Sequence, residues 1–272
     1  MKITNHKLAD VPFKKSPNTG GLFGEDMPDT IVIHYTAGAS TESSVNTLCS
    51  PATGASAHLV VARDGGITQL VPFNTIAWHA GQSSYKGRNG FNKYSIGIEI
   101  DNPGRLTKSG EKYYAWFGKE YPREVVFEGV HRNETTLSFW HRYTEEQIST
   151  VFRICEILTE HYGIKLILGH EEISPGRKSD PGPAFPLDKV RERVLDKDRR
   201  ADRPAIGLPV TQKRGIVTAG KLNIRSSPLM SAVTVASPLT RGTILNIEEE
   251  RGGWYKVKVE IEGWVKKDFV KT

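Results

Sequence analysis

A charged tract near residue 200 divides the sequence into two parts that follow different patterns. Residues 188–203 read DKVRERVLDKDRRADR, whose first half could end a helix and whose second half offers nothing to bury. Pro204, Gly207 and Pro209 follow, and breakers after such a charge run are typical of a linker between domains. We therefore predict a first domain over residues 1–197, a linker over 198–213 and a second domain over 214–272.

The composition is that of a globular chain, and 272 residues suffice for two domains. Hydrophobic residues make up 38% and charged residues 25%, which excludes a disordered chain and a membrane-embedded one. No run approaches the roughly 18 apolar residues of a spanning helix, and the N-terminus lacks the apolar segment of a secretory signal. We expect a monomer without a signal peptide that is cytoplasmic as made and does not bind a membrane.

The net charge of +6 is spread evenly along the chain. From Gly215 onward there are nine basic and six acidic residues, which leaves 28 and 25 in the first 214. A nucleic-acid surface would concentrate lysine and arginine on one element, so this distribution argues against a nucleic-acid partner. It fits a weakly anionic polymer partner or an ordinary soluble surface.

The first part mixes short β-rich runs with a helix. Residues 144–162 combine a capping box, made by Thr144 and Gln147, with an apolar stripe of helical period. Strands interleaved with helices predict an α/β layered fold. The expected strands lie in the runs TIVIHY, SAHLVVAR, ITQLVPF, SIGIEI and KLILGH.

The second part contains short strands separated by turns. Apolar and polar residues alternate in WYKVKVE, the period of half-buried strands, and about sixty residues of this kind predict a small β-barrel. The pieces LNIRSSP, GGWYKVKV and GWVKKDFV resemble the bacterial SH3-type (SH3b) module, whose relatives are often cell-wall-binding appendages. A barrel that merely stabilises or spaces the first domain is the alternative.

Two histidines end apolar strands, where a side chain is held rigidly and can face a cleft. They are His34 in TIVIHYTAG and His170 in LILGHEEI, and either one alone is more often a structural histidine. Asp180 follows on the loop SPGRKSDPGPAFP, which prolines and glycines stiffen. Two imidazoles and one carboxylate suit Zn²⁺ with a fourth position open to water.

Hydrolysis at such a site needs a proton shuttle and a group that stabilises an oxyanion. In the run SIGIEI, Glu99 shares a face with Gly97, opposite the isoleucines, so we expect the glycine to leave room for a substrate. Lys178 lies two residues before Asp180 and could place an ammonium near the oxyanion. Taken alone, Glu99 and Lys178 would be ordinary surface residues.

These motifs together resemble the zinc-dependent N-acetylmuramoyl-L-alanine amidases of the amidase-2 family, most closely its AmpD-like members. The resemblance runs from about Pro28 to Phe185 through TIVIHYTAG, SAHLVVARDG, ITQLVPFNTIAWHAG, SIGIEI, FWHRYTEEQ and GHEEISPGRKSDPGPAFP. It implies a mixed central sheet flanked by helices for the first domain, to which the SH3-like barrel predicted above adds a small C-terminal all-β domain. It also implies zinc held by His34, His170 and Asp180, with Glu99 as proton shuttle and Lys178 as oxyanion stabiliser. The implied reaction is hydrolysis of the amide between N-acetylmuramic acid and L-alanine in peptidoglycan or muropeptides.

Five further residues are expected near the substrate. His58 and His79 fall in the family motifs SAH and WHAG, and we expect them to line the cleft or to support the zinc ligands. Weaker candidates for substrate contact are Trp78, Arg88 and Asn92, of which Trp78 could equally belong to the core.

An aromatic-rich segment between Asp101 and Tyr143 leaves two roles open. Its rings could form a wall of the substrate groove and stack on sugar faces, or they could pack an additional hairpin onto the core.

Two questions of function also stay open at this stage. Some relatives of this fold bind peptidoglycan without cutting it, so a non-catalytic binding protein is the alternative to an amidase. A recycling enzyme, a phage lysin and an effector exported by a non-Sec route would all fit the sequence.

Overall fold

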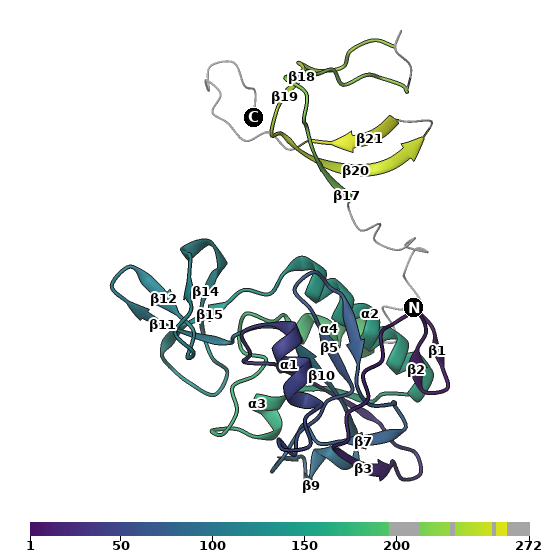
Figure 1. The fold of residues 1–272 in the computed structure, drawn as a ribbon, viewed down its shortest axis with the longest axis vertical. Coiled ribbons are helices and arrows are strands. Elements are labelled where there is room, and N and C mark those ends of the chain that lie inside the picture. Colours follow the sequence, from purple (N-terminus) through teal and green to yellow (C-terminus); the bar gives the residue numbers. More distant parts are fainter. Residues whose placement is uncertain (196–212, 229–231, 252–253, 260–272) are drawn as a thin grey trace. The chain divides into compact units, whose positions relative to one another are not determined.

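The computed structural model describes residues 1–195, 213–228, 232–251 and 254–259. The chain separates into two compact units, Met1–Ala201 and Asp202–Thr272 (Figure 1). This division falls within the segment predicted as a linker, which lies outside the described residues except at its last position.

A five-stranded mixed sheet forms the centre of the first unit. Its strands, in spatial order, are β16 (Leu166–Gly169), β4 (Thr30–Tyr35), β10 (Ser95–Ile100), β5 (Leu59–Val61) and β6 (Ile67–Gln69). The first four are parallel, and β6 pairs antiparallel with β5. The predicted α/β fold with a mixed central sheet is confirmed, and the runs TIVIHY and SIGIEI form β4 and β10 from end to end.

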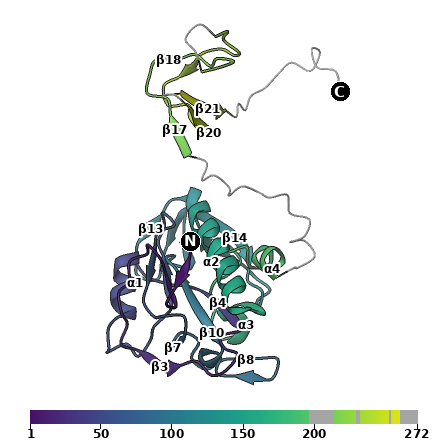
Figure 2. The ribbon, with the colours of Figure 1, turned by 90° about the vertical axis from the view of Figure 1, so that its right-hand side faces the viewer.

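Helix α2 (Glu145–Tyr162) packs on one face of this sheet with α4 (Leu187–Leu195) beside it (Figure 2). Thr144 caps α2: its hydroxyl accepts the Gln147 N–H, and the Gln147 side chain accepts the Thr144 N–H, as predicted. The isoleucines of β10 are fully buried in the core shared with both helices. Each such side chain contributes about 1.5–3 kcal/mol relative to an exposed one. The opposite face of the strand is thus left for polar residues.

On the same face of the sheet, the neighbouring strands β4 and β5 pack against smaller helices through apolar clusters. Val60 of β5 packs with Val45 of α1 (Thr41–Leu48), and Val32 of β4 packs with Ile173 of α3 (His170–Ile173). Short elements complete the first unit: β1 (Ile3–Thr4), β2 (Lys7–Leu8), β3 (Thr19–Leu22), β7 (Thr75–Ala77), β8 (Ser84–Tyr85), β9 (Arg88–Asn89) and the 3₁₀ helix η1 (Phe91–Lys93).

The aromatic-rich segment forms a second, antiparallel sheet. Its strands, in spatial order, are β13 (Glu120–Tyr121), β12 (Lys112–Tyr114), β11 (Arg105–Ser109), β15 (Leu137–His141) and β14 (Val126–Val130), with the 3₁₀ helix η2 (Arg123–Val125) before β14. Leu106, Tyr113 and Val126 form its own small core. Trp140 is buried, whereas Trp116 is 76% exposed and donates its ring N–H to the Ala37 carbonyl at 2.8 Å. Most of the rings therefore pack into this sheet, and Trp116 is the exposed exception among those described.

The described part of the second unit is built from strands. They are β17 (Lys213–Ile216), β18 (Lys221–Leu222), β19 (Leu239–Thr240), β20 (Ile244–Arg251) and β21 (Trp254–Lys258). Val217, Leu239 and Leu245 form a buried cluster, with Val257 and Val259 packed against it. The predicted strand in GWVKKDFV lies outside the described residues, so the SH3-like barrel stays a prediction. None of the described helices is long and apolar enough to span a membrane.

Candidate metal centre and active site

The carboxyl edge of the central sheet brings the main predicted site residues together. His34 lies near the end of β4, Glu99 pairs with it in register on the parallel neighbour β10, and His170 follows β16 directly. The ends of parallel strands meet at one edge of a sheet, which is where ligand sites occur in open α/β folds. The parallel pairing of β16, β4 and β10 therefore brings these three residues to one edge.

Three ligand atoms converge at this edge. His34 Nδ1 lies 3.0 Å from His170 Nδ1 and 2.9 Å from Asp180 Oδ2, and His170 Nδ1 lies 3.0 Å from the same oxygen. All three residues are buried, with at most 6% exposed. They form the one group of metal-binding type found among the described residues.

A chain of hydrogen bonds fixes the proton on the His34 ring. His79 Nε2 lies 3.1 Å from the Ser95 carbonyl oxygen, which can only accept, so this nitrogen carries the proton. Burial, with His34 as the next cause, holds the pKa of His79 well below its usual range, so the ring is neutral. His79 Nδ1 then accepts from His34 Nε2 at 2.9 Å, which leaves the His34 Nδ1 lone pair facing Asp180.

His170 is oriented in the same way by a different carbonyl. Its Nε2 lies 3.1 Å from the Ala80 carbonyl oxygen and donates to it. The guanidinium of Arg177 donates to the same oxygen at 3.0 Å and holds this segment in place. This contact turns the Nδ1 edge of the His170 ring toward Asp180, whose Oδ2 lies 3.0 Å away. Histidines that bind metals are commonly oriented by such partners.

The donor set fits a cation. Burial, followed by the neighbouring His170, lowers the pKa of His34 to about 4, so the ring is neutral at pH 7. The Nδ1 atoms of His34 and His170 and the carboxylate oxygen of Asp180 face one another at 2.9–3.0 Å, an arrangement that a positive charge among them would stabilise. Two imidazoles and a carboxylate are a common zinc set.

Glu99 lies beside this group. Its Oε2 is buried and has no hydrogen-bond partner among the described residues. Burial raises the pKa of Glu99 well above its usual range, the charge of Asp180 adds to this, and Lys178 opposes it. A raised pKa brings a carboxyl closer to the pH at which it can both accept and release a proton, as a proton shuttle must.

One expectation about this strand is wrong. We expected Gly97 to leave room for a substrate, but the ring of His79 occupies that space. A Cβ at position 97 would lie 2.4 Å from His79 Cγ. Gly97 is therefore required for the His79 ring to lie beside β10, where it accepts a hydrogen bond from His34.

Lys178 is exposed on the loop before Asp180. Its charge contributes to the pKa of both Glu99 and His34, so its ammonium acts on the site electrostatically.

The structure gives supporting positions to three of the predicted substrate residues. His58 is fully buried; its Nε2 donates to the Thr75 carbonyl at 2.9 Å and its Nδ1 accepts the Gly97 N–H at 3.0 Å. Of the two roles considered for His58, support is therefore favoured over a direct contact. The carboxamide of Asn92 accepts the backbone N–H groups of His79 and Ala80, at 3.0 and 2.7 Å.

The third of these, Arg88, binds both oxygens of Asp29 at 3.0 Å and stacks on Tyr94, so its donors face a protein partner. Trp78, in contrast, is 39% exposed and available for contact.

Sequence reasoning missed the residues that hold the Asp180 loop. The Tyr35 hydroxyl lies 2.7 Å from Ser179 Oγ, and the Tyr143 hydroxyl donates to the Pro181 carbonyl at 2.8 Å. Glu171 accepts the Gly182 N–H at 3.0 Å. The position of Tyr35 directly after a ligand was the one available signal.

The fold and this donor set define a class of protein: an α/β domain with a metal-binding group at the carboxyl edge of its sheet. The family model for N-acetylmuramoyl-L-alanine amidase (Amidase_2) matches residues 24–183, and the chain belongs to this family.

Individual relatives agree with this assignment. The chain is 35% identical over 142 residues to 1,6-anhydro-N-acetylmuramyl-L-alanine amidase AmpD of Escherichia coli, covering 52% of this chain and 57% of that protein. It is 33% identical over 173 residues to N-acetylmuramoyl-L-alanine amidase AmiD of Escherichia coli, covering 61% and 52%. The chain thus spans about half the length of the curated relatives it matches.

A solved structure of AmiD from E. coli, in complex with anhydro-N-acetylmuramic acid-L-Ala-D-γ-Glu-L-Lys, is also similar. It has 28% identity and a TM-score of 0.47, covering 67% of this chain and 65% of that one.

Proposed function

We propose that this protein is a zinc-dependent N-acetylmuramoyl-L-alanine amidase. It would hydrolyse the amide between N-acetylmuramic acid and L-alanine in peptidoglycan or in muropeptides. The observation that carries the proposal is the convergence of His34, His170 and Asp180 within 3.0 Å of one another, beside the buried carboxyl of Glu99. The names of the AmpD and AmiD relatives supply the substrate class.

Zinc held by these three residues would lower the pKa of a water molecule toward about 7 and polarise a carbonyl oxygen. Glu99 would take a proton from the attacking water and deliver it to the nitrogen of the leaving L-alanine, so that one water splits one amide into a carboxylic acid and an amine. Lys178 would offset the negative charge that develops on the carbonyl oxygen. His79 and the Ala80 carbonyl would hold the ligand rings throughout.

The experiment is digestion of purified muropeptides, with mass spectrometry to detect peptides that begin with free L-alanine. Glu99→Gln should keep zinc and reduce turnover by about 10²-fold or more, because the carboxamide cannot shuttle a proton. His34→Ala should purify without stoichiometric zinc. If the wild type releases the peptide, normal turnover in Glu99→Gln and full zinc content in His34→Ala would contradict these assignments. Retention of muropeptides without cleavage would instead support the binding-protein alternative.

The proposal extends to the second unit as an SH3b-like domain that binds the cell wall. The test compares the full chain with residues 1–197 on intact sacculi and on soluble muropeptides. Equal activity of both proteins on sacculi would exclude a targeting role for the second unit, and activity of the shorter protein on soluble fragments controls for its folding.

A further inference from the structure

Glu171 connects two of the proposed zinc ligands. It follows His170 directly, its backbone N–H donates to the Asp180 carbonyl at 2.8 Å, and its side chain accepts the Gly182 N–H at 3.0 Å. His170 and Asp180 are ten residues apart, so this one residue ties the helix that carries the first ligand to the loop that carries the second.

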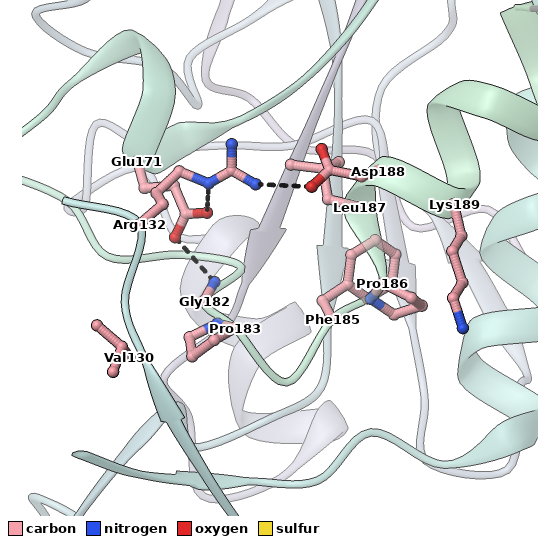
Figure 3. A pocket seen from close by; sticks show the side chains of 10 residues that line it. All are labelled: Val130, Arg132, Glu171, Gly182, Pro183, Phe185, Pro186, Leu187, Asp188 and Lys189. Atoms are coloured by element: carbon pink, nitrogen blue, oxygen red, sulfur yellow. Dashed lines mark hydrogen bonds and ion pairs between the residues drawn. The ribbon is translucent and has the colours of Figure 1, made fainter. Parts of the chain in front are cut away.

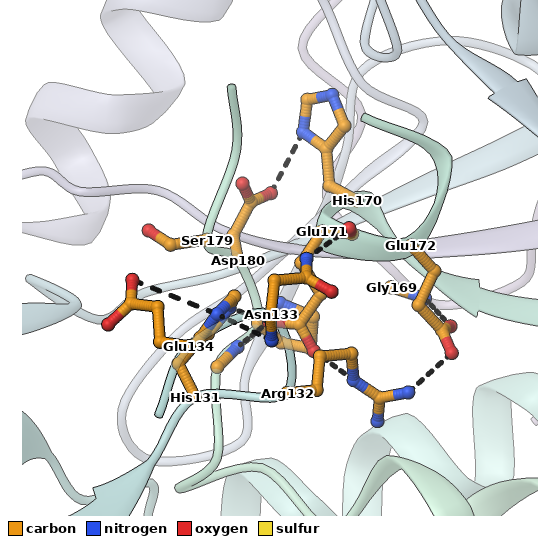
Figure 4. A network of polar contacts seen from close by, with 12 residues as sticks. His131, Arg132, Asn133, Glu134, Gly169, His170, Glu171, Glu172, Ser179 and Asp180 are labelled. Atoms are coloured by element: carbon orange, nitrogen blue, oxygen red, sulfur yellow. Dashed lines mark hydrogen bonds and ion pairs between the residues drawn. The ribbon is translucent and has the colours of Figure 1, made fainter. Parts of the chain in front are cut away.

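The second sheet supplies the groups that hold Glu171. His131, which directly follows β14, donates from Nε2 to Glu171 Oε2 at 2.6 Å, and Arg132 donates from Nε to the other oxygen at 2.7 Å. Asn133 donates to the Glu171 carbonyl at 2.8 Å. Figure 4 shows these side chains gathered around Glu171, with His170 and Asp180 close by. Arg132 also pairs with Glu172, so the segment 131–133, outside the central sheet, contacts both glutamates that follow His170.

The contact between His131 and Glu171 is buried, and the His131 ring is closely packed. His131 and Glu171 are each 2% exposed, and the His131 ring stacks on Trp140 with centroids 5.6 Å apart. Trp140 in turn lies against Gly182, where a Cβ would come within 2.8 Å of its ring. A buried carboxylate is stable only when its oxygens are bonded, so these donors fix where Glu171 can lie.

On another side the packing is incomplete. A pocket of about 350 Å³ borders Arg132, Glu171 and Gly182 (Figure 3). Side chains do not fill this space, so on this side the loop lacks packing and is held by its hydrogen bond to Glu171.

We propose that His131 is a positioning residue of the metal site, through which the sheet of residues 105–141 sets the distance between His170 and Asp180. This inference rests on the proposed function for the presence of zinc. It concerns residues that contact the ligands' neighbours and not the reacting atoms.

The experiment measures the Zn²⁺ dissociation constant of the full chain at fixed pH, by competition with a chromophoric chelator. His131→Leu removes the donor and should weaken zinc binding about 10- to 100-fold, the usual effect of removing a partner that orients a ligand. His131→Gln restores an N–H donor to Glu171 and should bind zinc within about threefold of the wild type. Glu128→Gln, on β14 but paired with Arg123 at the surface, is the matched control and should bind zinc normally.

A second readout needs no metal. In the zinc-free protein, His131→Leu should speed amide hydrogen exchange at Gly182 while amides of β10 keep their protection, whereas general destabilisation would speed both. If His131→Leu does not fold, Arg132→Met removes the other donor to Glu171, along with its pair to Glu172, and should weaken zinc binding by a smaller factor.

The outcomes separate the two proposals. A wild type that binds no zinc would overturn the proposed function. Zinc binding by the wild type, with His131→Leu within threefold of it or with His131→Gln as weak as His131→Leu, would overturn the positioning role alone.

Discussion

A methyl group at position 97 tests directly the hydrogen-bond chain from His34 through His79 to the Ser95 carbonyl. Gly97 lies in β10, and a Cβ there would lie 2.4 Å from His79 Cγ and 2.7 Å from its Nδ1. The backbone of Gly97 is outside the left-handed region, so alanine brings no backbone strain. Any loss of stability in Gly97→Ala therefore reports the contact with the ring.

The size of the effect follows from these distances. Ordinary contact begins at 3.4 Å, so the ring must move by roughly 1 Å, and overpacking of this kind costs about 1–3 kcal/mol. The same shift breaks the 2.9 Å hydrogen bond from His34 to His79, which adds about 0.5–1.5 kcal/mol. We expect Gly97→Ala to lower the free energy of unfolding by about 2–4 kcal/mol, with weaker zinc binding.

The assay is urea unfolding of the full chain in the presence of a chelator, for Gly97→Ala, His79→Ala and the double variant. Removing the ring removes the clash, so the double variant should lose at least about 1 kcal/mol less than the sum of the single losses. Gly24→Ala is the matched control, since a Cβ there has nothing within 4 Å, and it should be neutral. Additive losses, or a Gly97→Ala protein as stable as the wild type, would refute the reasoning.

Three further predictions concern pH, an exposed ring and zinc. Burial lowers the pKa of His58 to about 4, below the usual 6.5, so the unfolded chain binds the extra proton. The contribution of His58 to the free energy of unfolding is therefore complete above pH 6.5 and is lost as the pH falls toward 4. About 2 kcal/mol of this free energy should be lost between pH 7 and pH 5. His58→Gln should remove that part of the pH dependence, measured by unfolding in the presence of a chelator. Trp116→Ala should leave the free energy of unfolding within about 1 kcal/mol but raise KM for muropeptides about two- to tenfold if the ring stacks on substrate, and an unchanged KM would exclude that role. Zinc at a hundred times its dissociation constant should stabilise the wild type by about 2.7 kcal/mol and leave His34→Ala unaffected in thermal unfolding.

The sequence was sufficient for the strands and the main helix. TIVIHY and SIGIEI are short, apolar and β-branched, and such runs have few alternatives to a buried parallel strand. The capping box at Thr144 located the start of α2 because its two hydrogen bonds are local. The grouping of His34 with Glu99 was expected only from the family resemblance, and the structure shows its basis, because the two residues pair in register on neighbouring parallel strands.

The second sheet and its contacts could not be predicted in the same way. Its strands are two to five residues long, and they pair across turns that periodicity does not resolve. Nothing in the letters HEEI distinguishes Glu171, which is buried against His131, from its neighbour Glu172. The contact depends on where a separate sheet comes to lie, which is a property of the whole fold.

The contacts of Asn92 show why the tautomers of the ligand histidines could not be predicted from the sequence either. Its one carboxamide oxygen accepts from the N–H groups of both His79 and Ala80, the residues whose ring nitrogen and carbonyl receive the Nε2 protons of His34 and His170. The last acceptors in the two hydrogen-bond chains are the backbone carbonyls of Ser95 and Ala80. A substitution cannot remove a backbone carbonyl, but a side chain can determine where it lies. Together with Arg177 at the Ala80 carbonyl, the Asn92 amide holds the segment 79–80 and so orients the rings of His34 and His170 toward Asp180. Asn92, which we expected to contact substrate, thus supports the hydrogen-bond partners of the two ligand histidines. The geometry of a metal site depends on the residues that hold the partners of its ligands.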